Sequence, residues 1–158
     1  MIFKVVSGGQ TGVDQAALQA AINQQITHGG WCPKGRIAEN GVIPAEYILQ
    51  ETESSDYGER TRLNIRDSDG TLILVDKILE GINDGTILTI KEVKEKNKPH
   101  LIYDVSQDNK LDSVVKWIQD NDIRILNIAG PRESQSPGIY KLCLNVLENL
   151  YVLITKVD

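Results

Sequence analysis

A glycine-rich segment follows the first apolar run of the chain and leads directly into residues with helical spacing. It consists of Gly8, Gly9, Gln10, Thr11 and Gly12. Glycines let the backbone approach a ligand closely, and the amide groups at the start of a helix carry partial positive charge, so this segment is a candidate cradle for phosphate. Two structural explanations stay open: a tight turn needs glycine in any case, and Thr11 and Asp14 have the spacing of a capping box.

A second candidate lies in residues 31–55, which contain several glycines and prolines but no sustained periodicity. Lys34 and Arg36, on either side of Gly35, could contact an anion, although two solvated charges are the alternative. Trp31 could cover a flat heterocycle or act as a packing anchor. His28 and Cys32 do not belong to a cluster with metal-ligand spacing, so we predict no metal site.

A third set of polar residues shares one face of a predicted helix that begins near Asp56. Tyr57, Arg60, Thr61 and Asn64 follow the spacing i, i+3, i+4, i+7. A helix packed on a sheet should direct apolar groups inward, so this polar face should turn either to solvent or into a ligand crevice.

Two further loops carry glycine beside polar residues. Gly85 and Thr86 stand near the start of another predicted helix and could form a second helix end that binds anions. A later loop contains Gly130, Pro131, Arg132, Glu133 and Ser134. Arg132 is the best single candidate for gripping an oxyanion. We expect Ser136 to cap the helix that follows, with Pro137 as its first residue.

The elements that must position these residues follow a βα pattern. Five apolar runs predict strands, at residues 2–6, around residue 26, and at 72–75, 101–105 and 123–128. Helical spacing predicts helices near residues 13–22, 111–118 and 139–150, besides those beginning near 56 and 85. This alternation indicates an α/β fold, Rossmann-like and doubly wound, with a mainly parallel sheet of five or slightly more strands and helices on both faces. In such a sheet the ligand crevice lies beyond the carboxyl ends of the strands, where the candidate loops would meet.

Composition limits the classes of function. The chain has 158 residues, a length that predicts a single domain over residues 1–158. It has 17 Lys and Arg against 22 Asp and Glu, and this net charge of −5 argues against a broad nucleic-acid surface. No apolar stretch reaches the ~20 residues of a membrane span and no signal peptide is recognisable, so we expect a soluble cytoplasmic protein without a membrane partner. Any anionic ligand must therefore be held by a local cluster of cations.

Several long blocks of the sequence together resemble the molybdenum cofactor carrier family, a circularly permuted branch of the Rossmann-like SLOG superfamily. The blocks are SGGQTGVDQAAL (7–18), HGGWCPKGRIAENG (28–41), Arg60-Thr61 with Asn64 and DSDGTLI (67–73), and NIAGPRES with PGI (127–134 and 137–139). The resemblance implies a crevice that binds a phosphate-bearing ligand, either molybdenum cofactor (molybdopterin) or a related nucleotide derivative. Family members usually have basic residues at the positions of Gln15 and Ile37 and glycine at that of Asp84, so ligand identity or affinity could differ here.

The leading hypothesis is a non-enzymatic carrier. The loops 8–12 and 130–134 would hold phosphate and oxyanion groups, Lys34, Arg36, Arg60 and Arg132 would supply charge, and Thr61 and Asn64 would orient the ligand. A molybdoenzyme or a cofactor-biosynthesis protein would be the partner, and we expect a homo-oligomer. The alternatives are a sensor of a nucleotide derivative and a phosphoribohydrolase-like enzyme with Glu133 or Glu92 as its acid or base.

Overall fold

A computed structural model describes residues 1–77, 83–107 and 110–155 of the chain. Its centre is a five-stranded sheet in which all neighbouring strands run parallel, in the order β2-β1-β9-β7-β8. The strands are β1 (Lys4–Val6), β2 (Thr27–Gly29), β7 (Gly70–Val75), β8 (His100–Asp104) and β9 (Ile125–Ala129). The predicted α/β Rossmann-like class with a five-stranded parallel sheet is confirmed.

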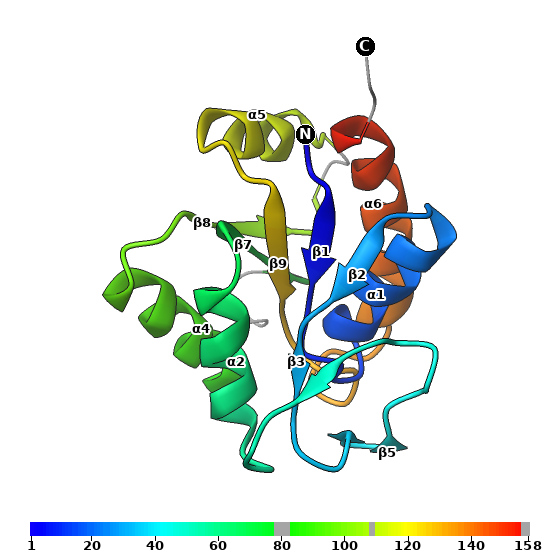
Figure 1. Ribbon diagram of the computed structural model, residues 1–158. Helices are drawn as coiled ribbons and strands as arrows, with labels where there is room; N and C mark the ends of the chain where they lie inside the picture. The colour runs from blue at the N-terminus through cyan, green and yellow to red at the C-terminus, as the bar shows by residue number, and fades with distance from the viewer. Residues whose placement is uncertain (78–82, 108–109, 156–158) are drawn as a thin grey trace.

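Helices cover both faces of this sheet (Figure 1). On one face α1 (Val13–Asn23) and α6 (Ile139–Ile154) pack together, and α5 (Asp112–Asp120) contacts α6. On the other face α2 (Tyr57–Arg66) packs against α4 (Asp84–Glu95). Alanines 16, 17, 20 and 21 are fully buried and let α1 approach its neighbours closely, and the hydroxyl of Tyr151 on α6 donates a hydrogen bond to the carbonyl of Ala17 at 3.1 Å. None of the helices in the described ranges is long and apolar enough to cross a membrane.

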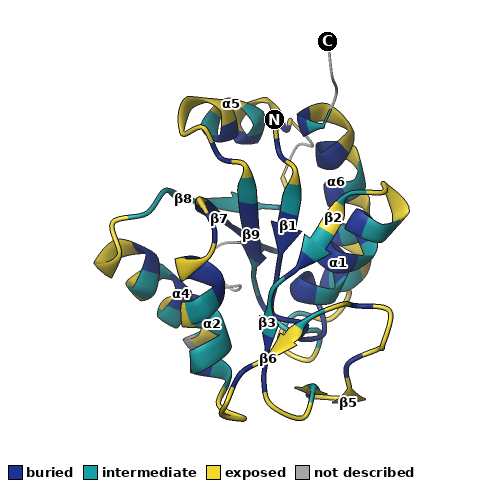
Figure 2. Ribbon diagram, viewed as in Figure 1, coloured by how far each residue is buried: buried dark blue, intermediate teal, exposed yellow. Residues whose placement is uncertain are grey.

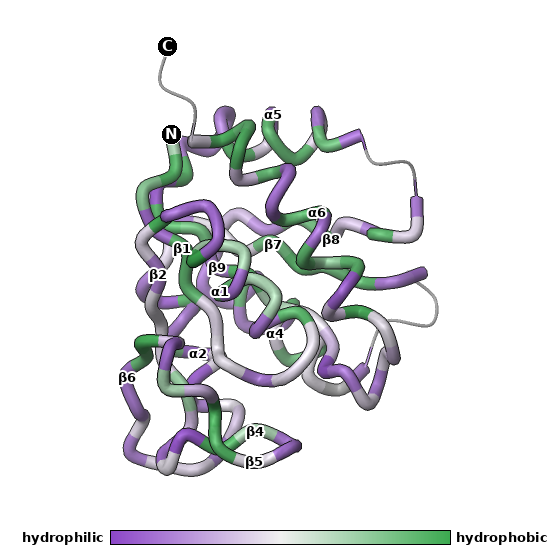
Figure 3. Tube along the Cα trace, turned by 90° about the vertical axis from the view of Figure 1, so that its right-hand side faces the viewer, coloured by the Kyte–Doolittle hydropathy of each residue, from purple (hydrophilic) through white to green (hydrophobic). Residues whose placement is uncertain are grey.

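The apolar runs that predicted strands form the interior. All six residues of β7 are buried, and Figure 2 shows buried residues concentrated in the central strands. Figure 3 shows the hydrophobic stretch along β7 in a second view. A parallel sheet covered on both faces requires strands that are apolar on both sides, which explains why β7 reads as a continuous apolar run.

The predicted start of α6 is wrong. Ser136 does not cap this helix: Gly138 is the N-cap, with a left-handed φ of 90°, and Ile139 is the first helical residue. The carboxylate of Glu133 accepts hydrogen bonds from the backbone N–H groups of Gly138 at 2.6 Å and Tyr140 at 3.0 Å. A residue five positions before the N-cap therefore satisfies the free amide groups that the sequence pattern assigned to Ser136.

The aperiodic residues 31–55 form a small substructure beyond the carboxyl ends of the central strands (Figure 1). Its strands β3 (Trp31–Cys32) and β6 (Gln50–Glu51) pair in parallel, and β4 (Ile37–Ala38) and β5 (Gly41–Val42) form an antiparallel hairpin. Cys32, Ile43 and Tyr47 bury themselves against Leu18 of α1 in a second hydrophobic cluster. The segment is thereby anchored over the sheet edge at which a ligand crevice is expected.

The strand order places that crevice. From β1 the chain moves through α1 to β2 at one edge of the sheet, and from β7 it moves through α4 to β8 at the other edge. The last strand, β9, fills the gap between β1 and β7. Connections that diverge in this way leave a crevice at the carboxyl ends of the strands between them.

Lys98 holds the carboxyl end of α2. Its ammonium group donates hydrogen bonds to the carbonyls of Ile65, Arg66 and Ser68 at 2.9, 2.7 and 2.6 Å. We expect Lys98→Met to lower the free energy of unfolding by about 2 kcal/mol, because several charge-assisted bonds to carbonyls at the end of the helix are lost. Urea unfolding measures the change, and Lys94→Met, which alters an exposed lysine of α4, should change stability by less than about 0.5 kcal/mol. Equal losses in the two variants would contradict this role.

Candidate functional site

A cleft lies at the carboxyl ends of β1 and β9 and is walled by α2 and the start of α4. Its cavity volume is about 100 Å³, and it is open to solvent. Its lining comes from four segments of the chain: Gly8, Gln10 and Asp14; Tyr57, Arg60, Thr61 and Asn64; Asn83, Gly85, Thr86, Leu88 and Thr89; and Asn127, Ile128, Ala129, Gly130, Arg132 and Gln135. The polar face of α2 therefore turns into the cleft rather than to solvent.

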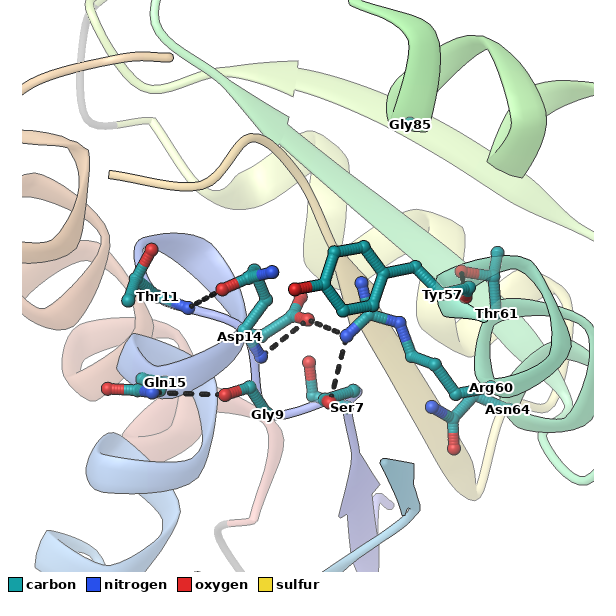
Figure 4. Close-up of polar contacts among 12 residues, drawn as sticks. Ser7, Gly9, Thr11, Asp14, Gln15, Tyr57, Arg60, Thr61, Asn64 and Gly85 are labelled. Atoms are coloured by element: carbon teal, nitrogen blue, oxygen red, sulfur yellow. Dashed lines mark hydrogen bonds and ion pairs between the residues drawn. The ribbon is translucent and has the colours of Figure 1, made fainter. Parts of the chain in front are cut away.

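Arg60 and Asp14, which both line this cleft, form an ion pair (Figure 4). The guanidinium lies 3.4 Å from the carboxylate, donates a 2.9 Å hydrogen bond to the carbonyl of Gly8, and stacks over the ring of Tyr57. A Cβ at position 8 would come within 2.6 Å of the Arg60 side chain. The glycine at this position therefore makes room for an arginine, which in turn faces the cleft.

Asp14 is a buried carboxyl group with unusual electrostatics. Burial raises its pKa above the ordinary value, and the charge of Arg60 and the hydrogen bond from the Gln10 N–H oppose that rise. The side chain of Asp14 is 8% exposed and that of Arg60 13%. The spacing of Thr11 and Asp14 is that of a capping box, but the N-cap of α1 is Gly12, and no side chain makes a capping hydrogen bond there.

Two buried polar atoms in the cleft lining have no hydrogen-bond partner among the residues that the structure describes: Gln10 Nε2 and Thr86 Oγ1. The orientation of the Gln10 amide is fixed, because its Oε1 accepts from the N–H groups of Thr11 at 3.0 Å and Glu39 at 2.8 Å. Gln10 is 5% exposed and Thr86 3%. Unpartnered buried polar groups are costly, and in native proteins they commonly mark a place where a ligand or water completes the bonding.

Thr61 and Asn64 line the cleft but already have partners. The hydroxyl of Thr61 donates to the carbonyl of Tyr57. The amide of Asn64 bonds both backbone groups of Trp31, accepting from its N–H at 2.8 Å and donating to its carbonyl at 3.0 Å. Asn64 thus fixes β3 to α2. The Trp31 indole donates to Asp67 and does not line the cleft, so the structure does not bring this ring to the candidate site.

The structure also leaves Lys34, Gly35 and Arg36 outside the cleft lining. Lys34 and Gly35 are exposed. The guanidinium of Arg36 donates to the carbonyls of Ile43, Pro44 and Tyr47, so this arginine closes the loop of residues 36–47 upon itself. These acceptors are backbone carbonyls brought close by the fold of the loop, so the sequence alone does not indicate them.

The loops 8–12 and 130–134 meet each other and divide their residues between two surfaces. The N–H of Val13 donates to the carbonyl of Pro131, and a Cβ on Gly12, which has a φ of 78°, would lie 2.5 Å from that carbonyl oxygen. Gly8, Gln10, Gly130 and Arg132 face the cleft. Thr11, Gly12, Glu133 and Ser134 instead line a separate groove on the outside, and Gly9 and Pro131 line neither surface.

Glu133 accepts the two backbone hydrogen bonds from α6 described above, and Glu92 pairs with Lys96 at 3.5 Å outside the cleft lining.

We expect Glu133→Ala to lower the free energy of unfolding by about 1 kcal/mol, the usual effect of losing a helix cap. Chemical denaturation provides the measurement. Glu148→Ala is the control, since its carboxylate bonds the exposed Asn23 side chain rather than a helix end, and a loss for Glu133→Ala no larger than this control would contradict the capping role.

Several contributing residues escaped sequence analysis. Asn127 lines the cleft and donates to the Thr71 hydroxyl, and Glu39 contacts both phosphate-candidate loops. Asn127, a polar residue in an otherwise apolar strand, was a usable signal, whereas Glu39 offered none. Of the two residues that depart from the family pattern and are described, Gln15 donates to the Gly9 carbonyl at 3.0 Å and Ile37 is exposed on β4. The side chain of Asp84 lies outside what the structure describes.

The chemistry that the cleft offers is hydrogen-bond donation and positive charge beside one buried carboxyl. In the portions of the chain that the structure describes, no group of three or more His, Cys, Asp or Glu could hold a metal ion. An arginine, an amide N–H donor and a hydroxyl are together suited to oxyanions such as phosphate.

Comparisons with known proteins agree with this architecture. The profile of the circularly permutated YpsA SLOG family matches residues 5–151. A crystal structure of a "putative molybdenum carrier protein" from Syntrophus aciditrophicus is similar, with a TM-score of 0.86 and 41% sequence identity, covering 98% of this chain and 96% of the other. A search of curated proteins finds no match.

Proposed function

The chain belongs to the circularly permutated YpsA SLOG family, and from this premise we propose that its cleft binds and carries a phosphate-bearing ligand, with molybdenum cofactor (molybdopterin) as the leading candidate. The similarity to a protein named as a molybdenum carrier supports the choice of ligand. The groups that line the cleft support the proposal that this ligand bears a phosphate.

The observation that carries the proposal is the pair of unpartnered buried atoms, Gln10 Nε2 and Thr86 Oγ1. They come from elements 76 positions apart in the sequence, the loop after β1 and the start of α4, yet both line one cleft. Thr86 lies in the first turn of α4, where the helix end favours negative charge. A phosphate there would accept hydrogen bonds from both atoms.

The remaining groups suit a carrier. Arg60 and Arg132 would balance the charge of the phosphate, and Asn64 and Trp31, through their mutual bonds, would keep the wall formed by α2 in place. Molybdopterin, when bound, would supply the dithiolene that holds molybdenum. A carrier must protect and release its ligand without reacting with it, which is compatible with a cleft whose best-placed acid, Asp14, is paired with an arginine.

Purification under anaerobic conditions tests the proposal. The protein should retain a pterin that becomes fluorescent on oxidation, together with molybdenum detected by metal analysis. Protein purified without ligand should bind added molybdopterin, and adenosine monophosphate serves as the probe for the alternative, a nucleotide derivative. Failure to retain a pterin combined with failure to bind added molybdopterin would overturn the choice of ligand, and binding of adenosine monophosphate alone would favour the nucleotide reading.

A further inference from the structure

Glu39 lies at the turn of the β4–β5 hairpin, and its carboxylate collects donors from both loops. One oxygen accepts from the Thr11 hydroxyl and from the Ser134 N–H, the latter at 3.1 Å. The other accepts from the Ser134 hydroxyl and lies 3.4 Å from Nε of Arg132. Four donor groups therefore surround one carboxylate, and none of them comes from the hairpin that carries it.

The Thr11 hydroxyl and the backbone of the two loops are held in place independently of Glu39. The Thr11 hydroxyl also accepts from the Glu133 N–H at 3.1 Å, Glu133 caps α6, and the two loops are joined by the bond from Val13 to Pro131. The loops 8–12 and 130–134, which carry the donors, are thus joined to each other and to α6 at the sheet edge. An arrangement of two hydroxyls, one backbone N–H and a guanidinium is suited to a tetrahedral oxyanion as much as to a carboxylate.

For an external anion to reach these donors, the Glu39 side chain would have to rotate away from them. Its backbone N–H is held by Gln10 Oε1, whereas the neighbouring Asn40, Gly41 and Val42 are exposed. Although partial burial alone would raise it, hydrogen bonds from Ser134 and Thr11 hold the pKa of Glu39 below its usual value, so the group is an anion at neutral pH. The groove beside it, lined also by Lys141, is open to solvent.

We propose that Thr11, Arg132 and Ser134 form a second oxyanion site, at the side of the outer groove, which the carboxylate of Glu39 fills as an internal substitute for a phosphate group. A phosphate and Glu39 compete for the same donors, so the site is available only when the carboxylate swings away. Thr11 and Ser134 line the outer groove alone, whereas Arg132 also lines the cleft and is shared between the two sites.

Titration of inorganic phosphate into ligand-free protein, followed by calorimetry, tests this site. Glu39→Ala should bind phosphate at least tenfold more tightly than the wild type, because the competing anion is gone while the donors stay. Glu39→Ala/Ser134→Ala should lose that gain. Glu53→Ala, which removes an exposed carboxylate from the same segment, should match the wild type and controls for the change in net charge.

Phosphate that binds in the cleft would be detected in every variant, so only the additional binding in Glu39→Ala reports on the outer site. If Glu39→Ala does not fold, Glu39→Asp keeps a charged but shorter side chain and should show a smaller gain. No gain in either variant, or a gain that survives Ser134→Ala, would overturn the proposal and leave Glu39 as a purely structural contact.

Discussion

Replacing Arg60 with methionine is expected to lower the free energy of unfolding by roughly 3–5 kcal/mol at pH 8, because it leaves the carboxylate of Asp14 buried without its partner. The distance of 3.4 Å and the low exposure of both side chains support an effect of this size. The same substitution removes a cation from the cleft, so affinity for molybdopterin should also fall. Urea denaturation measures the first effect and anaerobic titration the second.

The loss of stability should depend on pH with a definite sign. The folded-state pKa of Asp14 is raised by burial, and removing Arg60 raises it further. A carboxyl whose pKa is raised on folding takes up protons in the folded state, so its contribution is favourable below the unfolded pKa, 3.8, and is lost as pH rises through the folded pKa. Arg60→Met should therefore be least destabilising at acidic pH and most destabilising at pH 8.

Two further variants isolate this cause. Asp14→Asn in the Arg60→Met background keeps an acceptor for the Gln10 N–H and removes the buried charge, so it should recover stability at pH 8. Arg62→Met changes an exposed arginine of the same helix, 3.9 Å from Asp56, and should have an effect below about 1 kcal/mol. A loss in Arg60→Met that is independent of pH and is not relieved by Asp14→Asn would contradict the buried-charge explanation.

Thr86→Val should weaken ligand binding while leaving the fold as stable or more stable. The substitution keeps the shape of the side chain and removes a buried hydroxyl that has no partner within the described part of the chain. Removing such a group can raise the free energy of unfolding by up to about 1 kcal/mol, whereas loss of one hydrogen bond to a charged ligand should reduce affinity for molybdopterin by about tenfold, or about 1.4 kcal/mol. Thermal unfolding measures the change in stability, and anaerobic titration measures the change in affinity for molybdopterin.

Thr89→Val is the matched control on the same helix. The hydroxyl of Thr89 donates to the carbonyl of Gly85 at 3.0 Å, so its removal takes away an existing bond rather than a free group. It should lower stability slightly and change affinity little. An unchanged affinity in Thr86→Val would show that this hydroxyl does not contact the ligand.

The fold could be predicted from the sequence because its signals are local. The continuous apolar run of β7 reflects burial on both faces, and the spacing of Val13, Ala17 and Ala21 reflects a helix with one buried side. The polar face of α2 could also be predicted, because Arg60, Thr61 and Asn64 share one face of a helix, where a helix packed on a sheet would carry apolar residues. The sequence does not specify what that face contacts, and the structure shows that it lines the cleft.

The site was less predictable because its partners are distant in the sequence. Lys34 and Arg36 have the positive charge that an anion site needs, but the guanidinium of Arg36 donates hydrogen bonds to backbone carbonyls of its own loop. Glu133 was a candidate acid, yet it serves as the cap of α6. The role of Glu39 depends on Ser134, 95 positions away, and no periodicity or spacing rule reports such a contact.

A crystal structure of the protein grown with molybdopterin under anaerobic conditions tests the central proposal most directly. A phosphate bound in the cleft should place an oxygen within about 2.7–3.2 Å of both Gln10 Nε2 and Thr86 Oγ1. Arg60 should remain paired with Asp14 beside it. A ligand whose phosphate lies outside the cleft, with Gln10 Nε2 and Thr86 Oγ1 still unpartnered, would contradict the assignment of this cleft as the binding site.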